Sequence, residues 1–435
     1  MIPLLMLLAL GGLMHAARSF AGASPSGAIL LTFGFLLLTA YFAARVVSRI
    51  GLPRLTGYLL AGIVTGPYVL GLVDKPMLEQ LKVVSGVAVC MIALTAGSEL
   101  KLAQVRPVAG VLTRLTLFAI VGSMFILGGV VYALRPLLPW LNAMDPTGAV
   151  AVAMMIGVAL SAQSPAVVMA LVSETRSEGP VTRVILAAVV VADLVVILCY
   201  AIASTVVGTV TGGGVELVRT VASVGWELLG SVGFGVLVGG LIGQFLRHVS
   251  RGASLFAVMI CLVVAEIGQR ILLDPLIVML AAGIWLENFS RADASRLLHE
   301  FESASLPVFL VFFALAGARI DLFTLYASLG PVAILAATRA VSFFVGGKLA
   351  TAGVGVDPAV RRYAWFGLVP QAGLALALAI LVQKSFPGFG PSASVILFGV
   401  VGFNELIAPV ILRAILIRSG EAGQREAADF ADSHR

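Results

Sequence analysis

The chain has 435 residues, of which 60% are hydrophobic and 11% are charged, against about 45–50% and about 25% in an ordinary soluble domain. With a mean hydropathy of +1.07, this composition excludes a water-soluble globular protein and predicts an all-α polytopic membrane protein. The net charge of +6 does not require a nucleic-acid partner, because multispanning proteins collect basic residues in their cytoplasmic loops.

Apolar runs between charged, proline and glycine breaks define the predicted elements. A spanning helix needs about 20 largely apolar residues. Thirteen or fourteen such helices are expected, near residues 2–17, 27–47, 54–73, 82–99, 108–134, 147–172, 181–207, 224–246, 253–270, 274–289, 303–320, 325–350, 360–383 and 391–417.

The first run precedes Ala21-Gly22-Ala23, which resembles a signal-peptidase site. The run lacks a basic segment in front of it, and this favours a retained helix over a cleaved leader.

Loop charges predict the orientation. Of the 28 Lys and Arg residues, 18 fall on the side of the C-terminus, eight on the other side and two within helices. The positive-inside rule therefore places the C-terminus in the cytoplasm of a multi-pass inner (plasma) membrane protein. Residues 418–435 are expected to form a short cytoplasmic tail.

Asp193 is a carboxylate in the middle of an apolar run, VILAAVVVADLVVILCYAIA. A charge at mid-membrane costs at least about 2.5–3.5 kcal/mol on insertion scales, so such a residue is a functional candidate by default. A buried and partly compensated aspartate could exchange a proton for a cation. The alternative is a structural hydrogen bond between helices.

Arg339 is the matching cation, inside PVAILAATRAVSFFVGGKLA. Arginine keeps its charge when buried, so it needs a carboxylate, a group of carbonyls or an anion. Snorkelling to a headgroup is the alternative, which its central position disfavours.

Two predicted helices are interrupted by polar residues and proline. The first carries Ser161, Gln163, Ser164 and Pro165, and the second carries Pro370 and Gln371 between Gly367 and Gly373. Proline removes a donor and frees a carbonyl, which is tolerated at membrane depth only within protein or beside a cavity. Paired interruptions in two halves of a chain are typical of transporters built from inverted repeats.

Several segments resemble the cation:proton antiporter superfamily, of the Nap and Kef sodium or potassium/proton exchanger kind. They include GLPRLTGYLLAGIVTGPYVLGLV (51–73), SAQSPAVVMALVSE (161–174), VVVADLVVI (189–197) and FFALAGARIDL (312–322). The resemblance covers about residues 28–421, without a C-terminal nucleotide-binding regulatory domain.

The resemblance implies an NhaA-like antiporter fold with inverted repeats and two crossed broken helices. A core (about 82–207 and 325–417) would move by an elevator mechanism against a dimerisation domain (about 27–73 and 224–320) of a homodimer. The family's ion-binding aspartate maps onto Asp193 and its basic residue onto Arg339. The chain departs from the pattern at Ala192, where members usually carry Asp, Asn or Gln.

These observations predict a secondary antiporter that exchanges Na⁺ or K⁺ for H⁺, as in pH homeostasis. Asp193 would be the shared proton and metal-ion site. An oxygen shell around the cation would be completed by Ser161, Gln163, Ser164 and freed carbonyls. The charge of this ion site would be modulated by Arg339 and Gln371. A single titrating carboxylate implies electroneutral 1:1 exchange.

Two other functions remain open at this point: a sodium- or proton-coupled anion transporter that uses Arg339, and a transport-dead sensor or scaffold suggested by Ala192. An enzyme is not expected, and neither is a cofactor, because the sequence holds no nucleophile–base pair, metal-ligand cluster or nucleotide motif.

Overall fold

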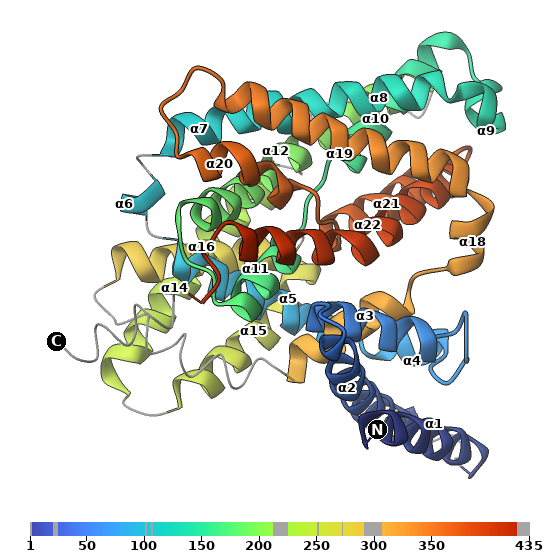
Figure 1. Ribbon diagram of the computed structural model, residues 1–435, viewed down its shortest axis with the longest axis vertical. Coiled ribbons are helices and arrows are strands. Elements are labelled where there is room, and N and C mark those ends of the chain that lie inside the picture. The colour runs from blue at the N-terminus through green and yellow to red at the C-terminus, as the bar shows by residue number, and fades with distance from the viewer. Residues whose placement is uncertain are drawn as a thin grey trace. The chain divides into compact units, whose positions relative to one another are not determined.

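The computed structural model describes residues 2–20, 25–100, 102–105, 108–211, 225–249, 252–271, 273–290 and 307–423. Their regular structure is helical throughout (Figure 1), so the predicted all-α fold class is confirmed. The predicted processing site at 21–23 and the tail beyond 423 lie outside these residues.

Seven helices among the described residues are long and apolar enough to cross a membrane. They are Ile29–Arg49, Ala109–Ala133, Pro146–Thr175, Pro180–Val210, Leu329–Thr351, Pro358–Ser385 and Gly390–Arg418. Two of these spans, Pro146–Thr175 and Pro358–Ser385, contain a non-helical interruption. Shorter apolar helices are Pro3–Ala17, Lys82–Thr95, Leu255–Gly268, Pro275–Phe289 and Pro307–Ala318.

The chain divides into two compact units, each built from two separate stretches. Unit 1 comprises Met1–Lys101 and Glu227–Leu322, and unit 2 comprises Leu102–Trp226 and Phe323–Arg435. Residues 82–101, which we expected in the core, fall in unit 1. The division into a moving core and a dimerisation domain stays a prediction.

Unit 1 is held together by close helix contacts at glycines. A Cβ on Gly97 would collide with the carbonyl oxygen of Leu280, and one on Gly283 would collide with that of Leu94. Such small residues let helix backbones touch where the membrane offers no hydrophobic drive for association. This packing explains why the helix at 82–99 belongs to unit 1.

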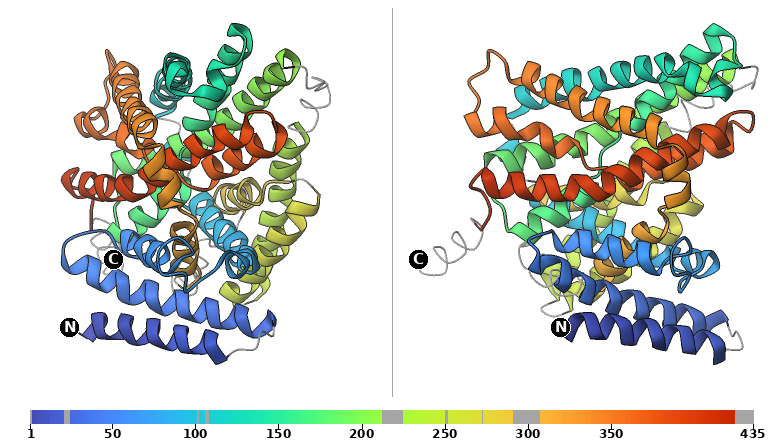
Figure 2. Two further views of the ribbon diagram at one scale, coloured as in Figure 1. Left: turned by 90° about the vertical axis from the view of Figure 1, so that its right-hand side faces the viewer. Right: turned by 45° about the vertical axis from the view of Figure 1, so that its right-hand side comes forward.

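The first two helices of unit 1, α1 (Ile2–Phe20) and α2 (Pro25–Arg49), lie side by side (Figure 2). The helices of unit 1 are α1 (Ile2–Phe20), α2 (Pro25–Arg49), α3 (Arg54–Thr65), α4 (Lys75–Gln80), α5 (Lys82–Glu99), α14 (Ser231–His248), α15 (Ala253–Arg270), α16 (Pro275–Phe289) and Pro307–Ala318.

Unit 2 contains both interrupted helices. Its helices are α6 (Leu102–Val105), α7 (Ala109–Arg114), η2 (Leu115–Val121), α8 (Gly122–Ala133), η3 (Arg135–Leu137), α9 (Pro139–Asn142), α10 (Pro146–Leu160), α11 (Pro165–Thr175), α12 (Pro180–Val210), α18 (Leu322–Ala327), α19 (Leu329–Thr351), α20 (Pro358–Tyr363), η5 (Ala364–Leu368), α21 (Gly373–Ser385) and α22 (Gly390–Arg418).

An apolar core surrounds the interruptions of unit 2. It draws fully or nearly fully buried residues from α10, α12, α19, α21 and α22, such as Leu160, Ala192, Leu335, Leu378 and Val400. Because these side chains exclude water, any polar group that the interruptions bring to this depth needs a partner inside the protein.

Candidate functional site

The first interruption of unit 2 separates α10 from α11. Residues 161–164, here called the first break, are non-helical and buried. Proline disfavours helical backbone in the residue before it, and Ser164 is accordingly extended, with φ −134° and ψ 98°. The Oγ atom of Ser164 then caps α11 by accepting a hydrogen bond from the backbone N–H of Val167 at 3.2 Å. The Ser164-Pro165 pair thus ends one half-helix and begins the next.

The second interruption lies between η5 and α21. Residues 369–372, here called the second break, include Pro370 and Gln371 and are also buried. The two breaks lie side by side in the middle of unit 2 (Figure 1), where the Nε2 atom of Gln371 donates to the carbonyl oxygen of Leu160 at 2.9 Å. The pair of interruptions predicted from the sequence is therefore present, and the two meet.

Arg339, on α19, joins the two breaks and is 0% exposed. Its Nε atom donates to the carbonyl oxygen of Leu160 at 2.8 Å, and its Nη2 atom donates to that of Ala162 at 2.7 Å. On the other side, Nη2 donates to the carbonyl oxygen of Leu368 at 3.1 Å, and Nη1 donates to that of Val369. All four hydrogen bonds go to main-chain carbonyls.

Of the three partners expected for Arg339, a carboxylate, a group of carbonyls or an anion, the structure shows the carbonyls. Carbonyls at the C-terminal ends of helices carry partial negative charge, and one planar guanidinium can bond several of them at once. We expected freed carbonyls to be cation ligands. The carbonyls of Leu160, Ala162, Leu368 and Val369 bond the guanidinium, and a role of freed carbonyls in binding the transported cation stays a prediction.

A buried amide pair supports the second break. Asn404, on α22, donates from Nδ2 to the Oε1 atom of Gln371 at 2.7 Å. Both side chains are buried, with Asn404 5% exposed. Asn404 is not among the site residues expected from the sequence, although a polar residue within the apolar run of 391–417 is a signal for such a partner.

The side-chain oxygens of the first break differ in the hydrogen bonds that they make. Ser161 Oγ donates to the carbonyl oxygen of Val158 at 2.7 Å, which leaves its lone pairs available. Gln163 Nε2 donates to the carbonyl oxygen of Ser161. The Oε1 atom of Gln163 is buried and accepts no hydrogen bond from any described residue. A buried acceptor without a donor is suited to a cation or a water molecule.

Asp193 lies on α12 and is 4% exposed. Its neighbour Ala192 belongs to the same buried cluster as Leu160 and Ala162. Nearer the start of α12, Ile185 packs against Gly367 of η5, where any Cβ would collide. Hydrogen bonds thus join Arg339, Gln371 and the first break, and α12, which carries Asp193, packs in the same buried cluster.

Residues 7–418 match the model of the transmembrane sodium/hydrogen exchanger family. A search of curated proteins finds no match. Two structures of the sodium proton antiporter MjNhaP1 from Methanocaldococcus jannaschii are similar at 16% identity. One, determined at pH 8, has a TM-score of 0.66 and covers 89% of this chain and 97% of that chain. The other, from an electron-microscopy map, has a TM-score of 0.73, and the match covers 91% of this chain and 98% of the MjNhaP1 chain.

Proposed function

The chain belongs to the transmembrane sodium/hydrogen exchanger family, a family of transporters rather than enzymes, and from this membership we propose that it exchanges Na⁺ or K⁺ for H⁺. We place it in the cell membrane with a cytoplasmic C-terminus, as a homodimer in which unit 2 moves. The multi-pass helices and the antiporter fold support this proposal.

Two observations carry the proposal: a buried carboxylate on α12, and a buried oxygen at the first break that accepts no hydrogen bond from the described residues. Asp193 supplies the negative charge, and Gln163 Oε1 supplies a neutral oxygen at the first break. A monovalent cation can use both, while a proton needs only the carboxylate. Competition between the two ions for Asp193 gives alternate loading, which is what an antiporter requires.

Arg339 contributes by making the broken backbone stable at this depth. Its four hydrogen bonds satisfy carbonyls of both breaks. Its positive charge would also keep the site from holding a cation too tightly, and Gln371 fixes one of the same carbonyls. An anion on the guanidinium is not favoured, since four of its five N–H groups already bond carbonyls.

Removing the Gln163 oxygen should weaken cation binding. In Gln163→Leu we expect the KM for the cation to rise about tenfold, the equivalent of about 1.4 kcal/mol for one lost ligand. The maximal rate should change less, because the proton still binds Asp193. The measurement is the initial rate of ΔpH-driven cation flux in proteoliposomes at several cation concentrations.

The matched control is Gln383→Leu, which makes the same chemical change at an exposed position of α21. Its KM should equal that of the wild type. A folded Gln163→Leu protein with an unchanged KM would remove Gln163 from the site.

Exchange should be electroneutral. One titrating carboxylate releases one proton as one cation enters, so no net charge crosses the membrane per cycle. A voltage-sensitive dye in proteoliposomes should report no potential during turnover. A potential that builds up with turnover would require a second titrating group.

The experiment that tests the proposal as a whole is ΔpH-driven flux with Na⁺, K⁺ and Li⁺ in turn. Exchange with at least one of them, absent from protein-free liposomes, is the expected result. If a folded, reconstituted protein exchanges none, the proposal fails and a sensor or scaffold becomes the better hypothesis.

A further inference from the structure

Helix α12 begins without a cap of its own. Gly179 at the N-cap position has no side chain to offer, and Pro180 has no N–H. The N–H of Arg183 bonds the carbonyl oxygen of Gly179 at 3.0 Å. The N–H groups of Val181 and Thr182 are therefore the two donors of the first turn that need a partner from elsewhere.

Glu421, which follows the end of α22, supplies that partner. Its Oε1 accepts from the N–H of Val181 at 2.7 Å, and its Oε2 accepts from the N–H and the Oγ1 of Thr182 at 2.8 and 2.7 Å. The side chain is 6% exposed. A Cβ on Gly179 would collide with the Glu421 carboxyl group, so the missing side chain at the N-cap makes room for this carboxylate.

Backbone hydrogen bonds fix the segment around Glu421. The N–H of Glu178 donates to the carbonyl oxygen of Glu421 at 3.0 Å, and the N–H of Gly423 donates to that of Thr175, the last residue of α11, also at 3.0 Å. We call Ser419–Gly423 the clasp. We expected residues 418–435 to form a cytoplasmic tail, but Ser419–Gly423 contain residues bonded to the turn between α11 and α12.

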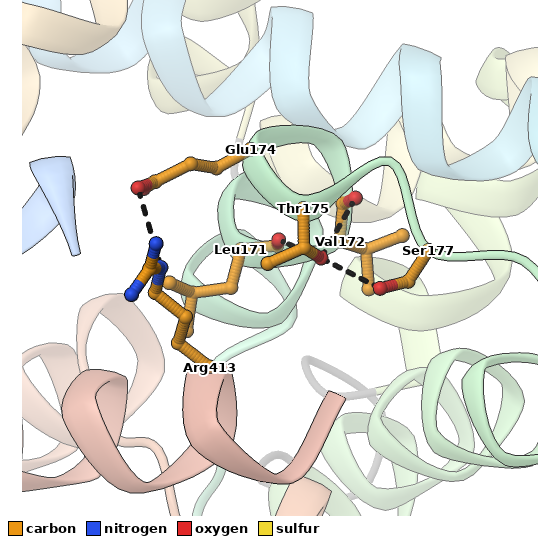
Figure 3. A network of polar contacts seen from close by, with 6 residues as sticks. All are labelled: Leu171, Val172, Glu174, Thr175, Ser177 and Arg413. Carbon is orange, nitrogen blue, oxygen red and sulfur yellow. Dashed lines mark hydrogen bonds and ion pairs between the residues drawn. The ribbon is translucent and has the colours of Figure 1, made fainter. Parts of the chain in front are cut away.

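Side chains strengthen the same junction (Figure 3). Glu174 of α11 lies 3.8 Å from the Nε atom of Arg413 on α22. Thr175 Oγ1 hydrogen-bonds Ser177 Oγ at 2.6 Å within the turn. The clasp and this ion pair thus tie together one end of α11, α12 and α22.

Each of these three helices carries part of the candidate site: α11 begins at the first break, α12 carries Asp193 and α22 carries Asn404. On the basis of the proposed function, we propose that the clasp positions Asp193 for ion exchange and that Glu421 is the positioning residue. Asp193 follows Val181 by 12 residues, about 18 Å along a helix. No glycine or proline interrupts that stretch, so a displacement of the helix end reaches the carboxylate.

Loss of the clasp should affect the two ions differently. A cation needs Asp193 and the oxygen of Gln163 at fixed separation, whereas a proton needs the carboxylate alone. A small shift of α12 therefore weakens cation binding and leaves proton binding nearly intact. The KM for the cation should rise, and the rate at saturating cation should hold.

The test compares Glu421→Gln and Glu421→Ala with the wild-type full chain in proteoliposomes. Glutamine keeps the shape but turns an NH₂ group toward an N–H donor. We expect the KM for the transported cation to rise about threefold in Glu421→Gln and about tenfold in Glu421→Ala, below the ~100-fold cost of an ångström-scale misplacement. Glu178→Gln is the matched control: this exposed side chain lies in the same turn, and the variant should keep the wild-type KM.

A lower maximal rate with an unchanged KM, in protein that is monodisperse by size exclusion, would show a purely structural role and overturn the inference. So would wild-type kinetics in both Glu421 variants. If the wild type exchanges no cation for protons, the proposed function fails. If the wild type does exchange them and the Glu421 variants have the same kinetics, the clasp inference alone fails.

Discussion

Asp193→Asn should reduce cation/proton exchange to the level of protein-free liposomes while the protein stays folded. Asparagine has the same shape as aspartate, so a side chain that is 4% exposed can be replaced without a cavity. The amide neither titrates in the accessible pH range nor neutralises a cation. Both half-reactions of the cycle should therefore stop.

The measurement combines flux with proton release. Calorimetric titration of the wild type with cation, in two buffers of different ionisation enthalpy, should show about one proton released per cation bound. Asp193→Asn should show none. Asp357→Asn is the control, because Asp357 caps α20 at an exposed position and asparagine caps equally well. Transport that survives in Asp193→Asn would remove this residue from the ion site.

Arg339→Lys should lower both stability and transport, although it keeps the positive charge. One ammonium group cannot reach four carbonyls in two breaks as the guanidinium does. Interhelical hydrogen bonds in membranes average about 0.6 kcal/mol, and bonds to charged groups in soluble proteins reach about 1.5–3 kcal/mol. We therefore expect a loss of about 2–5 kcal/mol, seen as a lower thermal transition in detergent.

Arg114→Lys provides the comparison for this substitution. Arg114 lies on α7 in an exposed position, with one hydrogen bond from Nη1 to the carbonyl oxygen of Ala352 at 3.2 Å. Its replacement should leave stability and exchange nearly unchanged. If Arg339→Lys matches the wild type in both, Arg339 acts through charge alone and the carbonyl bonds are dispensable.

The interruptions could be predicted from the sequence because their causes are local. Pro165 cannot donate to a helix and forces Ser164 out of helical geometry, whatever packs around them. At the second break Pro370 likewise has no N–H to donate, although Val369 before it keeps helical dihedrals, with φ −75° and ψ −40°. Burial of Asp193 and Arg339 could be predicted too, since each stands in an apolar run long enough to be within the membrane.

The partners of these residues could not be predicted in the same way. Arg339 bonds carbonyls that are about 30 and about 180 residues away in sequence, and the spacing of apolar residues says nothing about which groups face it. Segments that are distant along the chain are likewise joined by the hydrogen bond between Gln371 and Asn404 and by those from the N-terminus of α12 to Glu421.

The sequence by itself determined that this is a multi-pass helical membrane protein, where two of its helices break, and that Asp193 and Arg339 are buried. These are consequences of composition and of backbone chemistry within a few residues. The tertiary structure decided that both breaks meet on one guanidinium, that Gln163 retains an acceptor without a donor, and that residues after α22 cap the helix of Asp193. Those outcomes depend on how buried donors and acceptors from remote segments are matched in three dimensions, which the spacing of residues along the chain does not encode.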